Sequence, residues 1–536
     1  MTKDKGQTMK KRSLAGIAGI VAAATLISKI FGLLREQAIA AAFGVGPVVD
    51  AYAYAYVIPG FLLILLGGIN GPFHSALVSV LAKRDKAEAA PLVETVTTLV
   101  SVALLGIAVI LFIFAGLFID ILAPGLDPTA RAIAIQQLQI MSPLAVLAGL
   151  IGIGFGSLNA ADQYWLPSVS PLFSSLAVLG GVGVLFLQLG DQIQAPQYVR
   201  LGGLVLAGGT LAGAVLQWVA QLIAQWKTGM GSLRLRWDWR IPGVKEVMKV
   251  MAPATLSSGM LHINVYTDLY FASTISGAAA AMRYANFIVL TPLGVISNML
   301  LVPFLPVFAR LAAPENWDDL KIRIRQGLLL TALSMLPLTA IFIALSGPIV
   351  RLVYQRYAFD SEAAALVAPV LMAYGLGMFF YLGRDVLVRV FYALGDGETP
   401  FRISIANIFL NGILDYFLVQ ALATPGLVLA TVGVNITSMA LLLGLLNRRL
   451  NGLPLGQWGR SLLGIIFASA IAGCVSWGVS QGWEMWMGAS NLLLQVLQVG
   501  LASFMALAVF AAIASRLDLP EFDLMSDRLR RKFLKR

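Results

Sequence analysis

Residues 28–59 read SKIFGLLREQAIAAAFGVGPVVDAYAYAYVIP and hold four charged side chains in a chain that is otherwise mostly apolar. The four are Lys29, Arg35, Glu36 and Asp50. Charged groups at membrane depth are costly, so they usually pair with one another or face a water-filled cavity. This stretch therefore predicts that the chain crosses a membrane here and that its charges have a function.

The composition indicates a membrane protein throughout. Of the 536 residues, 58% are hydrophobic and 12% are charged, whereas soluble domains carry about 25% charged residues. The single cysteine excludes an intrachain disulfide, and the two histidines, His74 and His262, lie on different segments without a metal-ligand cluster. The net charge of +11 could indicate nucleic-acid binding, but the basic residues lie between apolar runs and at both ends. We therefore expect no nucleic-acid partner.

Fourteen apolar runs are long enough to span a bilayer, which takes about 20 residues of helix. All should be helices, because a backbone exposed to lipid must satisfy its own hydrogen bonds. The fold class predicted is thus an all-α polytopic membrane protein with fourteen transmembrane helices. The expected spans lie near residues 13–35, 48–82, 92–119, 128–158, 165–189, 199–226, 246–273, 277–311, 322–347, 361–385, 399–420, 426–447, 459–481 and 489–516.

The distribution of Lys and Arg predicts the orientation. Basic clusters precede the first span, follow the second and twelfth, separate the sixth from the seventh and the eighth from the ninth, and end the chain. All of these positions lie on one side, which is then cytoplasmic, with both termini inside. Arg351 and Arg356, after the ninth span, are the exception. A cleaved signal peptide is the alternative for the basic N-terminus, but its apolar run continues through Lys29 to Arg35.

The two halves of the chain resemble each other at a constant offset of 233 residues. The offset matches Gly44 with Gly277, Pro59 with Pro292, Pro167 with Pro400, Arg35 with Asp268, and Asp50 with Arg283. Internal repeats of this kind are typical of transporters with a substrate site between the halves. We expect two pseudo-symmetric six-helix lobes, 1–226 and 246–450, joined by a cytoplasmic linker, 227–245, and followed by a helix pair and a basic tail, 451–536.

Two interpretations of the charges in the first span stay open. In the structural one, Arg35 pairs with Asp50 or Glu36 and ties the first two spans together. In the functional one, Lys29 and Arg35 form part of a cationic cavity for an anionic substrate, because Lys and Arg suit phosphate groups.

A second polar group lies in the other half. Asp268 requires a partner, which could be Arg283, a proton or a cation. Asn411 and Asp415 are four residues apart and share a helix face, and Thr431 follows in the next span. Such oxygen ligands suit a small, hard cation, while hydrogen bonding between helices is the alternative. Because the sequence shows no nucleophile–base pair and no nucleotide-binding loop, we expect a transporter driven by a gradient or the membrane potential and not an enzyme.

Several motifs resemble the MurJ/MviN lipid II flippases of the multidrug/oligosaccharidyl-lipid/polysaccharide exporter superfamily. They are LISKIFGLLREQAIAAAFGVGPVVDAYAYAYVIP at 26–59, LAPGL at 122–126, SLNAADQYWLPSVSP at 157–171, QRYAF at 355–359 and ALGDGETPFRISIANIFLN at 393–411. The resemblance covers the whole chain, including two spans beyond the superfamily's usual twelve. QRYAF also accounts for the exceptional arginines after the ninth span.

The resemblance assigns roles to residues of this chain. It implies that Lys29, Arg35 and Asp50 contact the substrate, with Arg283 as a substitute for cations that the family carries elsewhere. It also implies a sodium site at Asp268, Asn411, Asp415 and Thr431. The chain departs from the family in the second span, which has no arginine between Arg35 and Arg84, and in the eighth, which reads YANF at 284–287.

We therefore predict a flippase in the bacterial inner membrane that moves lipid II, an undecaprenyl-pyrophosphate-linked peptidoglycan precursor, to the outer leaflet for cell-wall synthesis and cell shape. Membrane lipids and other cell-wall synthesis proteins are its candidate partners, and sodium or a proton its coupling ion. A cation-coupled multidrug antiporter, a flippase for another lipid-linked oligosaccharide and a non-transporting scaffold are the alternatives.

Overall fold

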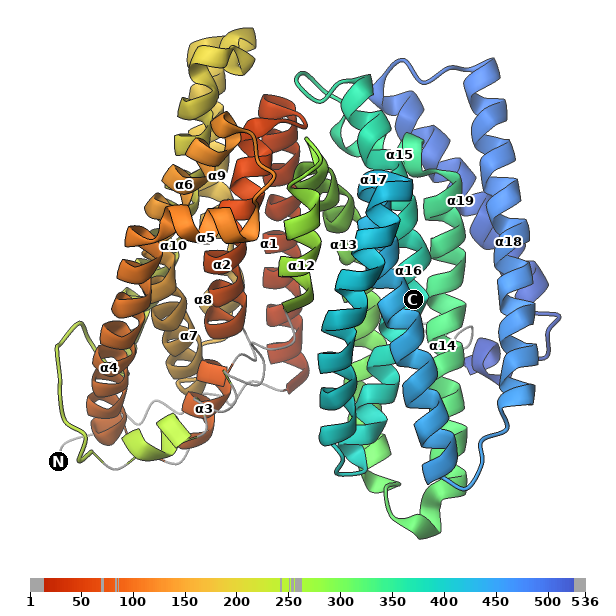
Figure 1. Cartoon of the computed structure of the whole chain (residues 1–536). Coiled ribbons are helices and arrows are strands. Elements are labelled where there is room, and N and C mark those ends of the chain that lie inside the picture. The colour runs from red at the N-terminus through yellow and green to blue at the C-terminus, as the bar shows by residue number, and fades with distance from the viewer. Residues whose placement is uncertain are drawn as a thin grey trace, which may run out of the picture. The chain divides into compact units, whose positions relative to one another are not determined.

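The structure is a computed structural model that describes residues 14–68, 72–81, 84, 86–241, 243–249, 251, 255 and 263–524. Every regular element within these residues is a helix (Figure 1). The chain groups into two compact units. Unit 1 contains Met1–Phe43, Pro47–Ile121 and Asp127–His262, and unit 2 contains Gly44–Gly46, Leu122–Leu126 and Ile263–Arg536.

The helices of unit 1 follow the apolar runs of the first half of the chain, with breaks inside several of them. They are α1 (Leu14–Phe43), α2 (Pro47–Gly67), α3 (Pro72–Leu81), α4 (Lys86–Ile113), α5 (Ala115–Leu122), α6 (Pro128–Met141), α7 (Leu144–Ala160), α8 (Trp165–Val169), α9 (Leu172–Leu189) and α10 (Val199–Thr228). Two 3-10 turns, η1 (Gly190–Gln194) and η2 (Pro196–Tyr198), connect α9 to α10.

Unit 2 holds the second half, including the helix pair at the end of the chain. Its helices are α12 (Ile263–Ala272), α13 (Ala278–Arg310), α14 (Trp317–Ala344), α15 (Ser346–Tyr354), α16 (Ser361–Ala393), α17 (Glu398–Arg449), α18 (Leu455–Trp486) and α19 (Leu492–Ala514), with the 3-10 turn η3 (Pro314–Asn316) before α14. Helices α18 and α19 pack against each other, and α18 also packs against α14.

The all-helical membrane architecture is confirmed. Among the described residues, ten helices are long and apolar enough to cross a membrane, or eleven if the pair α6 and α7, bent by 41°, forms one span. Helix α17 has 52 residues, about 78 Å of helix, more than twice the bilayer core of about 30 Å. It bends at Ala423, whose φ of 52° is not helical, so α17 accounts for two expected spans. The structure is thus consistent with fourteen spans.

Parts of the prediction lie outside the described residues. They include residues 1–13, the basic tail after residue 524, and much of the expected span 246–273, whose later part is α12.

Both helices of the second apolar run, α2 and α3, pack closely on α7. A Cβ on Gly152 would lie 2.0 Å from the carbonyl oxygen of Leu66, at the end of α2. A Cβ on Gly156 would lie 2.8 Å from the Cβ of Leu77 in α3. Glycines on this face of α7 therefore allow both helices to approach its backbone.

Replacing Gly152 with alanine should destabilise unit 1 by about 1–3 kcal/mol, because overpacking forces the backbone at Leu66 to move. The free energy of unfolding of the purified protein in detergent measures the effect. Gly106→Ala in α4 is the matched control, since nothing lies within 4 Å of a Cβ there, and it should be neutral or slightly stabilising. Equal stability of the two variants would contradict this packing.

Two of the sequence motifs meet in unit 2. Gly44, in the FGVG motif, has a φ of 57°, and a Cβ there would lie 2.4 Å from the carbonyl oxygen of Ala358 in QRYAF. The hydroxyl of Tyr284 donates a hydrogen bond to the Gly44 carbonyl at 3.0 Å. Tyr284 packs with Tyr354 and Phe359 in a buried aromatic cluster. The glycine is thus required both by its backbone conformation and by this contact.

The loop between α16 and α17 is held by Asp396. Its carboxylate accepts hydrogen bonds from the backbone and hydroxyl of Thr399 and pairs with Arg449. Burial alone would raise the pKa of Asp396, but the bonds from Thr399 and Arg449 hold the pKa below its usual range. The carboxylate therefore ties the start of α17 to its end.

Candidate functional site

Helices α12 and α17 bring two carboxylates together inside unit 2. The Nδ2 of Asn411 donates to Asp268 Oδ1 and to Asp415 Oδ2, at 2.7 Å in each case. The hydroxyl of Thr431 donates to Asp268 Oδ2 at 3.1 Å. The structure thus places the four residues predicted for a cation site in one hydrogen-bonded cluster.

The donor set of this cluster fits a small, hard cation. Asn411 and Asp415 are completely buried, and within the described residues their Oδ1 atoms have no hydrogen-bond partner. A buried oxygen without a partner is costly, and two carboxylates around one amide carry a negative charge that a cation or proton would offset. Oxygen ligands from carboxylate, amide and hydroxyl groups suit such an ion.

Two residues of the cluster were not predicted from the sequence. Tyr374 of α16 interacts electrostatically with Asp268. Asn435 donates through Nδ2 to the carbonyl oxygen of Thr431 at 2.9 Å and so orients this part of α17. Tyr374 belongs to a helix far from Asp268 in the sequence, so spacing did not indicate it. Asn435 lies four residues after Thr431 on α17, and this spacing was a signal that could have indicated it.

The charges of the opening stretch lie on α1 and α2 of unit 1. Arg35 donates through Nε and Nη2 to Glu36 Oε1, at 3.2 and 2.8 Å. Glu36 is almost fully buried, whereas the Arg35 side chain is 23% exposed. The pair joins neighbouring residues of one helix, so it does not tie α1 to α2. It neutralises the buried Glu36 and holds the guanidinium of Arg35 at the surface of α1.

The remaining predicted substrate residues lie on helices of both units. Lys29 is exposed on α1, Asp50 is buried near the start of α2, and Arg283 is half-buried on α13. Lys29, Arg35 and Asp50 belong to unit 1, and Arg283 belongs to unit 2. The structure therefore groups the first three on adjacent helices of one unit.

The cluster of Asp268, Asn411, Asp415 and Thr431 contains only two carboxylates, and the described elements carry no group of three or more His, Cys, Asp or Glu side chains that could hold a metal ion.

Long apolar helices with buried charges inside both units define a polytopic membrane transporter.

Comparisons with known proteins identify the family. Residues 39–497 match the family model described as lipid II flippase MurJ. The chain is 65% identical over 522 residues to the probable lipid II flippase MurJ of Synechocystis sp., covering 97% of this chain and 98% of the relative. The chain therefore belongs to the MurJ lipid II flippase family.

Solved structures support the same fold. A lipid II flippase MurJ in an inward closed conformation matches with a TM-score of 0.72 and 22% identity, covering 92% of this chain and 98% of the other. An inward-facing multidrug resistance MATE family transporter of the MOP superfamily matches with a TM-score of 0.61 and 15% identity, covering 81% and 98%. At these identities the likeness concerns the fold alone.

Proposed function

We propose that this protein moves lipid II from the cytoplasmic to the outer leaflet of the bacterial inner membrane by alternating access. The observation that carries this proposal is the identity of 65%, over nearly the whole chain, with a relative named as a probable lipid II flippase. Transport of a lipid-linked precursor breaks no covalent bond, so the chain needs binding groups and a change of access rather than catalytic ones.

The cationic side chains of α1 suit the substrate's pyrophosphate. Arg35 presents a planar guanidinium that forms paired hydrogen bonds with phosphate oxygens, and Lys29 adds a point charge on a flexible stem. The Arg35–Glu36 pair fixes where the guanidinium lies before the substrate arrives. Asp50 and Arg283 complete the proposed substrate-binding set.

The carboxylate cluster of unit 2 would hold the coupling ion. Asp268, Asn411, Asp415 and Thr431 supply oxygen atoms of the kind that sodium prefers. Bound sodium would offset the charge of the two carboxylates. There are two alternatives to sodium. In one, a proton shared between Asp268 and Asp415 is the coupling ion. In the other, the membrane potential alone drives transport.

The distribution of Lys and Arg supports an orientation with both termini in the cytoplasm. A lipid-linked substrate and the surrounding membrane lipids are the proposed partners, together with other cell-wall synthesis proteins.

Complementation of a bacterial strain depleted of its own lipid II flippase tests the function. We expect expression of this chain to restore growth and cell shape. A strain that depends on a flippase for another lipid-linked oligosaccharide should not be rescued. Rescue of that strain alone, or only an increase in drug resistance, would overturn the proposal in favour of an alternative.

A further inference from the structure

The segment that follows α10, residues 229–241, runs beside α4 within unit 1 and forms neither helix nor strand (Figure 1). We call this segment the strap. It contains the sequence LRLRWDWR at 233–240, in which apolar and charged residues alternate.

A buried carboxylate fastens the strap to α4. Glu94 is 5% exposed, and its Oε1 accepts hydrogen bonds from the backbone N–H and the hydroxyl of Ser232 at 3.1 and 2.7 Å. Arg236 places its Nε 3.4 Å from Glu94 Oε2, and its backbone N–H donates to Thr98 Oγ1 at 3.1 Å. The strap therefore has a defined inner face.

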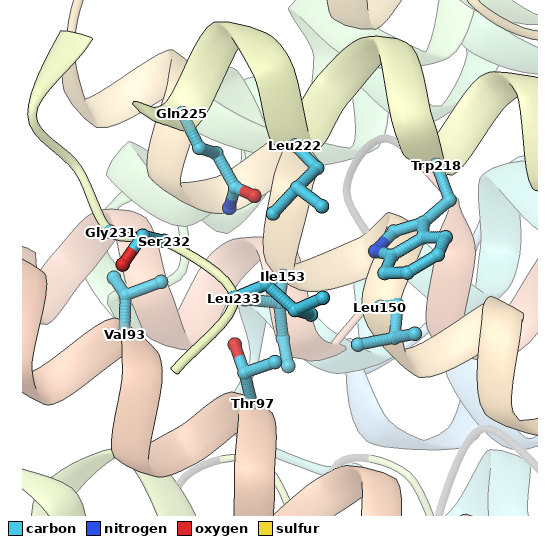
Figure 2. A pocket seen from close by; sticks show the side chains of 10 residues that line it. All are labelled: Val93, Thr97, Leu150, Ile153, Trp218, Leu222, Gln225, Gly231, Ser232 and Leu233. Carbon is cyan, nitrogen blue, oxygen red and sulfur yellow. The ribbon is translucent and has the colours of Figure 1, made fainter. Parts of the chain in front are cut away.

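The space behind the strap is too small to be a lipid site. A hollow lies between the strap and helices α4, α7 and α10, lined by Thr97, Leu222 and Leu233 among others (Figure 2). It has room for roughly one water molecule. Any ligand of the strap must therefore bind its outer face.

The exposed side chains of the strap include large apolar ones and two arginines. Leu235 is 94% exposed and Trp237 is 60% exposed. These two residues flank Arg236, which faces Glu94, and their exposure places them on the outer side of the strap. Trp239 is also exposed and contacts Trp237 edge to face. Exposed tryptophans beside the end of a membrane helix are typical of the membrane–water interface.

Arginines on the strap supply charge that complements anionic lipid. Arg234 and Arg240 are exposed, and only Asp238 carries a negative charge within 229–241. Clusters of Lys and Arg next to a membrane helix attract anionic headgroups. Trp226, in the last turn of α10, is also exposed, so the apolar surface of the strap continues onto the end of this membrane helix.

We propose that the strap binds anionic phospholipid headgroups with Arg234 and Arg240 while Leu235 and Trp237 insert at the headgroup–acyl boundary. This surface lies outside the proposed substrate and cation sites, so the inference does not depend on them. The strap joins the two halves of the chain. The proposal gives it a second role, as an anchor that responds to the lipid composition of the membrane.

An environment-sensitive fluorophore on the strap tests the proposal. Cys474 is the one cysteine of the sequence, so Cys474→Ser with Leu235→Cys allows a single label on the full-length protein in nanodiscs. We expect a blue-shifted emission with phosphatidylglycerol present, relative to phosphatidylcholine alone, and loss of the shift at high salt. Arg234→Gln with Arg240→Gln should weaken the inserted state about fivefold for each arginine.

The matched control removes two cytoplasmic charges elsewhere. Lys321→Gln with Arg323→Gln, in α14 of unit 2, should keep the shift. Equal spectra in the two lipid compositions, or an equal loss in the control, would overturn the proposal. So would a shift that requires an added soluble protein fraction, because the strap would then be a protein-binding surface.

Discussion

Replacing Asp268 and Asp415 together with asparagine is expected to abolish the stabilisation of this protein by sodium ions. Asparagine keeps the shape of aspartate, and at both positions its amide oxygen can still accept the hydrogen bond from Asn411. At position 268 the amide NH2 can donate to the Thr431 hydroxyl, which donates to Asp268 in this protein. The change removes both negative charges from the cluster. Since loss of partners that only orient a metal ligand costs 10–100-fold in affinity, loss of both charged ligands should lower sodium affinity by about 100-fold or more.

The thermal unfolding of the purified protein, compared in sodium and choline chloride, measures this effect. A ligand at about 100 times its Kd stabilises a protein by about 2.7 kcal/mol, and this gain should vanish in the double variant. Asn407→Ala is the matched control, because Asn407 lies one turn along α17 from Asn411 and hydrogen-bonds Ser438 instead. It should lower stability while keeping the response to sodium. A full response in the double variant would remove the proposed ion site.

The second large effect is expected at the cationic residues of α1. Lys29→Ala with Arg35→Gln should reduce lipid II translocation by about 100-fold or more, since hydrogen bonds to charged groups contribute about 1.5–3 kcal/mol each. The rate of lipid II appearance in the outer leaflet, at matched protein levels in the membrane, measures the effect. Rescue of the flippase-depleted strain should fail as well.

The choice of variants must distinguish a loss of substrate binding from a loss of folding stability. Removing Arg35 alone breaks its ion pair with the buried Glu36, and breaking a buried ion pair is itself strongly destabilising. Arg35→Gln should therefore be combined with Glu36→Gln, which preserves the net charge of α1. Arg131→Gln is the control, since Arg131 forms an exposed ion pair with Asp120 that contributes little to stability. Normal translocation with Lys29, Arg35 and Glu36 all replaced would contradict the cationic mechanism.

Much of the fold was predictable from the sequence because bilayer thickness sets a minimum length for an apolar run. The runs at 199–226 and 361–385 correspond to α10 and α16. Breaks inside runs were not predictable in the same way. The close packing of α2 and α3 on α7 depends on glycines about eighty residues further along.

The residues of the candidate sites were likewise predictable from the sequence only in part. Spacing placed Asn411 and Asp415 on one helix face, and Asp268 and Thr431 were singled out on other spans. The resemblance joined the four into one site, and the structure brings them together. The partner of Arg35 was left open between Asp50 and Glu36, and the structure shows the bond to Glu36. Tyr374 and Glu94 act through tertiary contacts between distant segments, which periodicity does not report. Asn435 lies four residues from Thr431 on the same helix, so its spacing could have indicated it.

Reconstitution into liposomes that contain lipid II tests the central claim most directly. A membrane-impermeant reagent that modifies lipid II from outside reports which molecules have reached the outer leaflet. We predict that vesicles with this protein expose the inner pool much faster than empty vesicles and than vesicles with the Lys29, Arg35 and Glu36 replacements. A rate equal to that of empty vesicles would contradict the assignment of this protein as a lipid II flippase.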